Sequence, residues 1–225
     1  LITMFGSIQA ALRVIDPAVV MAGEVPPEYL LSTIDLRLLH FNYWPGWVPL
    51  EQSIYSQYTT SFGRTIVLRG PQAADAGVKT RVANMLHSGS TFGRLWIDAW
   101  GDAAYTAETT YLQQHIAFRR ELSRFFVYGR LLRPVNATLL SGPANVSIVP
   151  AEEIKHNLTL PSHLQSLWLS KNGTEMGLML SNLAEEPVEL ALQVELRRTW
   201  LAAANRSQTL TCTRMEFESV AKPLK

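Results

Sequence analysis

The 225-residue chain contains a single cysteine, Cys212, and this scarcity excludes two kinds of covalent or metal framework. An internal disulfide needs a pair of cysteines, and a thiolate metal cluster needs several. The five histidines also show no pair at a spacing typical of metal ligands. We therefore expect neither a disulfide framework nor a metal site.

An excess of charge of one sign is lacking as well. Twenty basic and nineteen acidic residues give a formal net charge of +1. Nucleic acids and anionic bilayers attract proteins through clustered positive charge, so we predict no nucleic-acid partner. No apolar run approaches the roughly 20 residues that cross a bilayer, so we predict no membrane span.

Several catalytic patterns are missing. The chain has no G-x-S-x-G nucleophile elbow, and its glycines form no phosphate-binding loop. Cys212 lies in a β-type segment and is a poor candidate for a nucleophile. We therefore expect no nucleotide and no other cofactor.

The most unusual stretch that is present runs from His40 to Tyr58, HFNYWPGWVPLEQSIYSQY. It holds six aromatic rings and two prolines but one formal charge, Glu51. Proline removes a backbone donor, so we interpret the stretch as a shaped loop that leads into a short strand. Rings with an apolar face and a polar edge suit stacking under a sugar, although rings of this kind also plug the ends of protein cores. The candidate sugar-contacting residues are Tyr43, Trp44, Trp47, Tyr55 and Trp100.

The first part of the chain alternates between helical patterns and short apolar runs. Residues 18–23, AVVMAG, are typical of a strand that is buried on both faces of a parallel sheet. Residues 106–128 carry the helical apolar spacing over the longest stretch. This alternation predicts an α/β fold over residues 1–133. Its other expected elements are helices at 2–15 and 78–86, a helical turn within 29–36, strands at 38–41, 48–55 and 94–98, and irregular chain at 63–77.

Beyond Pro134 the apolar period changes. Residues 188–196 alternate apolar and polar side chains, which predicts a strand buried on one face. Asn172-Gly173 separates two apolar runs and is a strong hairpin signal. With a further strand expected at 208–213, residues 134–225 predict an antiparallel β-sandwich.

Asn-x-Ser/Thr sequons occur only in this second part, where average composition would give roughly half a sequon by chance. Their clustering favours a secreted or luminal glycoprotein; the alternative is a Ser/Thr/Asn-rich β domain that never meets the glycosylation machinery. The first residues follow a helical stripe and resemble no signal peptide, so we expect the chain to be a fragment. The candidate glycosylation sites are Asn136, Asn145, Asn157, Asn172 and Asn205.

Glu24 follows the apolar run 18–23 directly, and Val25-Pro26-Pro27 then turns the chain into a loop. The carboxylate is therefore expected on a rim. There it serves either catalysis or structure, the structural role being to cap a helix or to pair with an arginine. Asp98 ends a later apolar run and is the second catalytic candidate, and Asp102 is a further candidate for contacting substrate.

The order of these motifs resembles the C-terminal half of a glycosidase-type (β/α)8, or TIM, barrel followed by a β-sandwich. The motifs are AVVMAGE, the aromatic loop with VPLEQSIYSQY, RLWID, YGRLLRP and the hairpin SLWLSKNGTEMGLMLSN. The chain is most similar to uncharacterised glycosidase-like families that are distantly related to α-galactosidases. The likeness covers nearly the whole chain.

The resemblance implies hydrolysis of a glycosidic bond by two carboxylates at the carboxyl ends of barrel strands. It makes Glu24 the acid/base candidate, and the second carboxylate is either Asp98 or a residue in the remainder of the same barrel, N-terminal to this chain. Two alternatives stay open. The chain is either a non-catalytic carbohydrate-binding protein on a degenerate barrel, or a scaffold whose glycosylated sandwich contacts other proteins.

Overall fold

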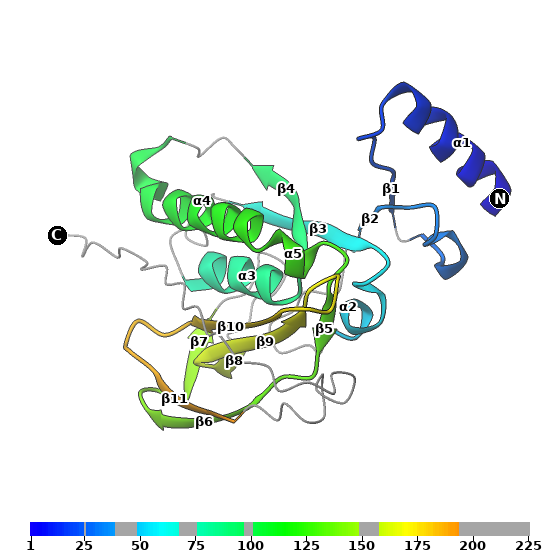
Figure 1. The fold of residues 1–225 in the computed structure, drawn as a ribbon. Coiled ribbons are helices and arrows are strands. Elements are labelled where there is room, and N and C mark those ends of the chain that lie inside the picture. The colour runs from blue at the N-terminus through cyan, green and yellow to red at the C-terminus, as the bar shows by residue number, and fades with distance from the viewer. Residues whose placement is uncertain (25, 39–48, 68–75, 97–100, 149–157, 194–225) are drawn as a thin grey trace.

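The computed structural model describes residues 1–24, 26–38, 49–67, 76–96, 101–148 and 158–193. These residues form a mixed α/β structure with one parallel sheet and several antiparallel sheets (Figure 1). The α/β character predicted for the first part of the chain and the antiparallel character predicted for the second are both confirmed.

The parallel sheet has four strands whose order in space is their order in the chain. Every neighbouring pair is parallel, and Glu24 pairs with Leu38, which in turn pairs with Phe62. The carboxyl ends of all four strands therefore lie at one edge of the sheet. The strands are β1 (Ala22–Glu24), β2 (Leu36–Leu38), β3 (Thr60–Val67) and β4 (Thr91–Trp96).

Two of the predicted strands differ from the structure. The run 18–23 was expected to be a strand buried on both faces, but β1 covers only Ala22–Glu24, and Ala22 and Glu24 are exposed. The reason is its position, because β1 has β2 on one side and ends the sheet on the other. Residues 48–55 were expected to be a strand, but Leu50–Tyr55 form helix α2, which begins directly after Pro49. A short apolar run does not by itself distinguish a strand from a buried helix.

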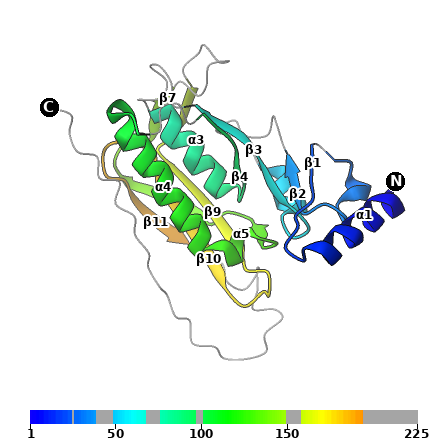
Figure 2. The same cartoon turned by 90° about the horizontal axis from the view of Figure 1, so that it is seen from above.

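The expected first helix is confirmed as α1 (Ile2–Ile15), but its apolar side chains are unusually exposed. It contacts the rest of the chain through Arg13, which pairs with Asp35, and through Gly6, which lies near Thr33. Met4 and Ile8 are 52% and 42% exposed, and none of its residues is buried. Figures 1 and 2 show α1 at the far end of the molecule, next to β1.

The expected long helix 106–128 is two helices. Helix α4 (Thr106–Glu121) ends at Leu122, whose φ of −94° and ψ of 19° depart from helical values, and α5 (Ser123–Phe126) follows. Helix α3 (Ala76–His87) packs on α4 and confirms the helix expected at 78–86. The apolar cluster between them consists of Val78, Val82, Met85 and Leu112. The described residues also contain two short 3-10 turns, η1 (Glu28–Leu30) and η4 (Ala103–Tyr105).

The hairpin predicted at Asn172-Gly173 is confirmed. It joins β9 (His163–Leu169) to β10 (Met176–Asn182), and Gly173 takes a φ of +71°, which glycine adopts readily. A β-sandwich stays a prediction, and the strand expected at 208–213 lies outside the described residues. The other antiparallel strands are β5 (Arg130–Leu132), beside β9, then β6 (Asn136–Ser141) with β11 (Glu189–Gln193), and β7 (Asn145–Ile148) with β8 (Leu158–Pro161).

One apolar core crosses the predicted domain boundary between residues 133 and 134. Trp168 of β9 is fully buried, and its ring meets the Phe126 ring edge to face at 5.4 Å between centroids. The two parts of the chain are therefore packed against each other, and the boundary itself stays a prediction. The cluster consists of Leu86, Leu122, Phe125, Phe126, Leu131, Trp168 and Met179.

Candidate functional site

The carboxyl edge of the parallel sheet is the place where the sequence predicted a site. Glu24 is the last residue of β1 and is exposed there. Residues 25, 39–48, 68–75 and 97–100 follow the carboxyl ends of β1, β2, β3 and β4 in the chain. Glu24 therefore lies at this edge of the sheet, whereas residues 39–48 and Asp98 lie outside the described residues.

Glu24 and Arg37 are assigned to opposite faces of the sheet, because side chains alternate along a strand. Arg37 pairs with Gly23 in the ladder, one residue before the pair formed by Glu24 and Leu38. Arg37 is buried and reaches Glu51 of α2, whereas Leu38 is only half-buried. Glu24 therefore belongs to the more open face.

Tyr55, a predicted sugar contact, belongs to a polar cluster on the covered face. Its hydroxyl donates to Glu28, and this hydrogen bond, followed by burial, raises the pKa of Tyr55. The Arg37 guanidinium lies 5.2 Å from the centre of the Tyr55 ring, and its Nη2 is 2.6 Å from the Glu51 carboxylate. These contacts hold Tyr55 between β2 and the turn η1, away from the face that carries Glu24.

The cluster around Arg37 is held together by an ion pair and a cation–π contact, and it has little free space. Arg37 is 8% exposed, and its Nε and Nη1 find no hydrogen-bond partner among the described residues. The adjoining cavity, which Ser56 and Trp168 also line, has a volume of about 10 Å³. That volume holds about one water molecule and no sugar ring. Arg37 was not among the predicted site residues; the available signal was a charged residue between two leucines in a short strand.

The remaining predicted site residues divide into two groups. The Asp102 carboxylate accepts a hydrogen bond from the Ala104 amide at 2.9 Å and caps the turn η4, so a structural role is visible for it. The others lie outside the described residues: Tyr43, Trp44, Trp47, Asp98 and Trp100.

Three of the five candidate glycosylation sites are described, and all three are exposed. Asn136 begins β6 and Asn145 begins β7. Asn172 lies in the hairpin turn, where its Oδ1 accepts from the Ser170 and Thr174 hydroxyls, each at 2.7 Å. Asn157 and Asn205 lie outside the described residues.

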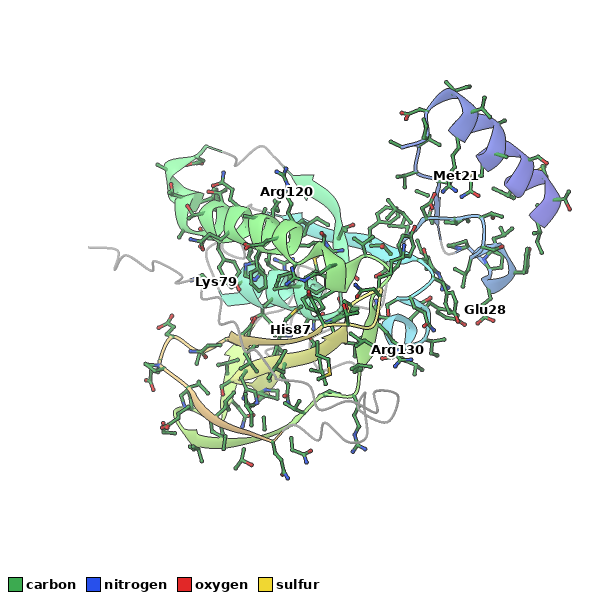
Figure 3. All side chains as sticks on the ribbon, viewed as in Figure 1. Met21, Glu28, Lys79, His87, Arg120 and Arg130 are labelled. Atoms are coloured by element: carbon green, nitrogen blue, oxygen red, sulfur yellow. The ribbon has the colours of Figure 1, made fainter. Side chains whose placement is uncertain are left out.

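His87 is a buried titratable group that lies near the centre of the molecule (Figure 3). Its Nδ1 is 3.0 Å from the Ser166 hydroxyl and its Nε2 is 2.9 Å from the Ser181 hydroxyl. Burial, assisted by the nearby His115, lowers the pKa of His87 to about 3. Both ring nitrogens are occupied by β9 and β10, so this histidine joins α3 to the antiparallel sheet.

The described residues offer neither a metal site nor a membrane span. They contain no group of three or more His, Cys, Asp or Glu side chains arranged to hold a metal ion. Of the helices that the structure describes, none has the length and apolar character of a membrane span.

No protein-family model, no curated protein and no solved structure matches this chain significantly.

Proposed function

We propose that this chain belongs to a glycoside hydrolase-like protein in which Glu24 is the acid/base residue. The supporting arrangement is a set of four parallel strands in consecutive spatial order, which is the order that a (β/α)8 barrel uses. Enzymes on that fold place their catalytic residues at the carboxyl ends of the strands. In this proposal the sheet is part of such a barrel, and the antiparallel sheets belong to a β-sandwich that follows it.

The reaction that fits these residues is hydrolysis of a glycosidic bond without a cofactor. The Glu24 carboxyl group would donate its proton to the glycosidic oxygen as the bond breaks, and water would supply the hydroxyl at the anomeric carbon. A second carboxylate is needed as nucleophile or base. Asp98, which follows β4 in the chain, is the candidate, and a residue from further strands of the same barrel is the other. Tyr43, Trp44, Trp47 and Trp100 would stack against the sugar.

The single observation that carries the proposal is the position of Glu24. It ends a parallel strand, is exposed, and belongs to the more open face of the sheet at the carboxyl edge. In the chain, residues 39–48 follow the neighbouring strand β2 directly.

Glu24→Gln tests the proposal in the protein at its natural length, with a panel of fluorogenic glycosides as substrates. We expect kcat to fall by roughly 10²–10⁴-fold, because a positioned general acid contributes about that much. Glu185→Gln is the matched control, since Glu185 is also exposed but follows β10 in the antiparallel part. A Glu24→Gln protein that turns over as fast as the control would remove Glu24 from catalysis.

The second candidate is a non-catalytic carbohydrate-binding protein. The observation that favours it is that Asp102, the first described carboxylate after β4 in the chain, caps the turn η4 and so serves structure rather than a catalytic pair. Under this function, wild type binds oligosaccharides without turnover, and Trp44→Ala and Trp47→Ala weaken binding while Glu24→Gln does not. If no sugar binds at all, the scaffold function, with the antiparallel part contacting other proteins, takes its place.

A further inference from the structure

A second, larger cavity lies at the opposite edge of the parallel sheet from Glu24. Its volume is about 740 Å³, within the range of small-molecule sites. Leu36, Thr60 and Thr91, the first residues of β2, β3 and β4, line its floor. The segment before β1 closes one side, and the ends of α4 and α5 close the other.

The charged side chains around this cavity are mostly basic. Its lining holds three arginines, Arg13, Arg119 and Arg120, and one acid, Asp35. The Asp35 carboxylate already has several partners. It accepts hydrogen bonds from Arg13 at 2.9 and 3.1 Å, from the Met21 amide at 3.1 Å and from the Tyr128 hydroxyl at 3.3 Å. Arg13 and Asp35 therefore neutralise each other, and Arg120 of α4 adds a positive charge at the cavity.

The two remaining arginines differ in their surroundings. Arg119 is half-buried, and its guanidinium lies 5.0 Å from the centre of the Phe126 ring, which fixes it at the wall. Arg120 is exposed and has no ion pair with any residue in the described part of the chain. Figure 3 shows Arg120 on the α4 side, well away from Arg130. Arg120 is thus a cation at the cavity that is available to a ligand.

The other walls are apolar and partly open to water. Val20, Ile116 and Val127 line the cavity and are 54%, 41% and 41% exposed. Exposed apolar side chains that gather around one concave site mark a binding surface more often than isolated ones do. The cavity thus offers an apolar enclosure with a cationic rim.

We propose that this cavity binds an amphiphilic anion, a molecule with an apolar body and one acidic group such as a carboxylate or a sulfonate. The body would lie against Val20, Ile116 and Val127, and the acidic group would receive hydrogen bonds from Arg120. A sugar without charge would gain hydrogen bonds from Arg120 but no ion pair. The site is independent of Glu24 and stands whether or not the protein hydrolyses glycosides.

Titration with 8-anilinonaphthalene-1-sulfonate, which joins an aromatic body to one sulfonate, tests the proposal by fluorescence. We expect one saturable site on the wild-type protein and about tenfold weaker binding to Arg120→Met, because a charge-assisted hydrogen bond is lost. Arg130→Met is the matched control, an exposed arginine on β5 outside the cavity, and should change the dissociation constant by less than about twofold. Ile116→Glu, which places a carboxylate in the apolar wall, should abolish binding while the melting temperature is kept.

Competition separates the contributions of the body and the charge. Decanoate should displace the probe, whereas decanol, which lacks the charge, and inorganic phosphate, which lacks the apolar body, should not at the same concentration. The proposal is wrong if Arg120→Met binds as tightly as wild type, if Arg130→Met is weakened equally, or if decanol competes as well as decanoate.

Discussion

At the scale of single residues, Gly89 packs closely against the ring of Trp168. A Cβ added to Gly89 would lie 2.8 Å from Trp168 Cζ2, and Trp168 Cη2 would be closer still. Gly89 also has a φ of +71°, which residues with a side chain rarely adopt. Two separate costs, backbone strain and steric overlap, therefore meet at one position.

The chain offers a matched pair that separates these costs. Gly173 has the same φ of +71°, but a Cβ there would meet nothing within 4 Å. We expect Gly173→Ala to lower the free energy of unfolding by about 1 kcal/mol through strain alone, and Gly89→Ala to lower it by about 2–4 kcal/mol because the Trp168 ring must also move. Chemical denaturation measures both. Equal losses would show that the contact with Trp168 contributes nothing.

At the scale of elements, α1 and α4 are opposite cases of helix burial. Leu12 of α1 is 36% exposed, whereas Leu112 of α4 is fully buried between α3 and α4. We expect Leu112→Ala to lower the free energy of unfolding by about 2–5 kcal/mol, and Leu12→Ala to change it by less than about 0.5 kcal/mol. Urea titration checks both variants. A large loss for Leu12→Ala would mean that the apolar side of α1 is covered in solution.

The sequence predicted elements well where one strong local signal was present. The helical period identified α1, α3 and α4, and Asn-Gly identified the hairpin between β9 and β10. It failed where tertiary contacts decide. Residues 50–55 of the strand expected at 48–55 became α2, and residues 63–67, which were expected to be irregular, belong to β3 (Thr60–Val67). The break of the long helix at Leu122 was also missed, since the apolar period runs on through it.

At the scale of the whole molecule, His87 joins the two parts of the chain. It lies at the end of α3 and contacts Ser166 of β9 and Ser181 of β10. Burial lowers the pKa of His87 to about 3 and the pKa of His115 to about 4. Both imidazoles are therefore neutral in the folded protein at a pH where the unfolded chain is protonated.

Acid should weaken the fold for this reason. The unfolded chain binds more protons than the folded one between about pH 6.5 and pH 3, so stability is fully present above that window and falls as the pH drops through it. We expect a slope of roughly 1 kcal/mol per pH unit from His87, and a smaller slope in His87→Gln. Urea titrations across this range measure it. A slope that is the same in His87→Gln and wild type would contradict the assignment.

The site was predictable only in part. The edge of the sheet and the exposure of Glu24 follow from an apolar run, an acid and two prolines, and the structure agrees with both. The cluster of Arg37, Glu51 and Tyr55 was not predictable, because the three residues are brought together by the folding of α2 against β2. The cavity at the amino edge of the parallel sheet is formed by α4, α5 and the first residues of three strands, and no local sequence pattern predicts that combination.

The most direct test of the account asks whether Glu24 donates a proton to the leaving group. Wild type and Glu24→Gln are compared on aryl glycosides whose phenols range from 2,4-dinitrophenol, which departs without a proton, to unsubstituted phenol, which needs one. We predict a loss in kcat of roughly 10²–10⁴-fold with the phenyl glycoside and a much smaller loss with the dinitrophenyl glycoside. The same loss with every leaving group, or no loss with any, would contradict the central claim.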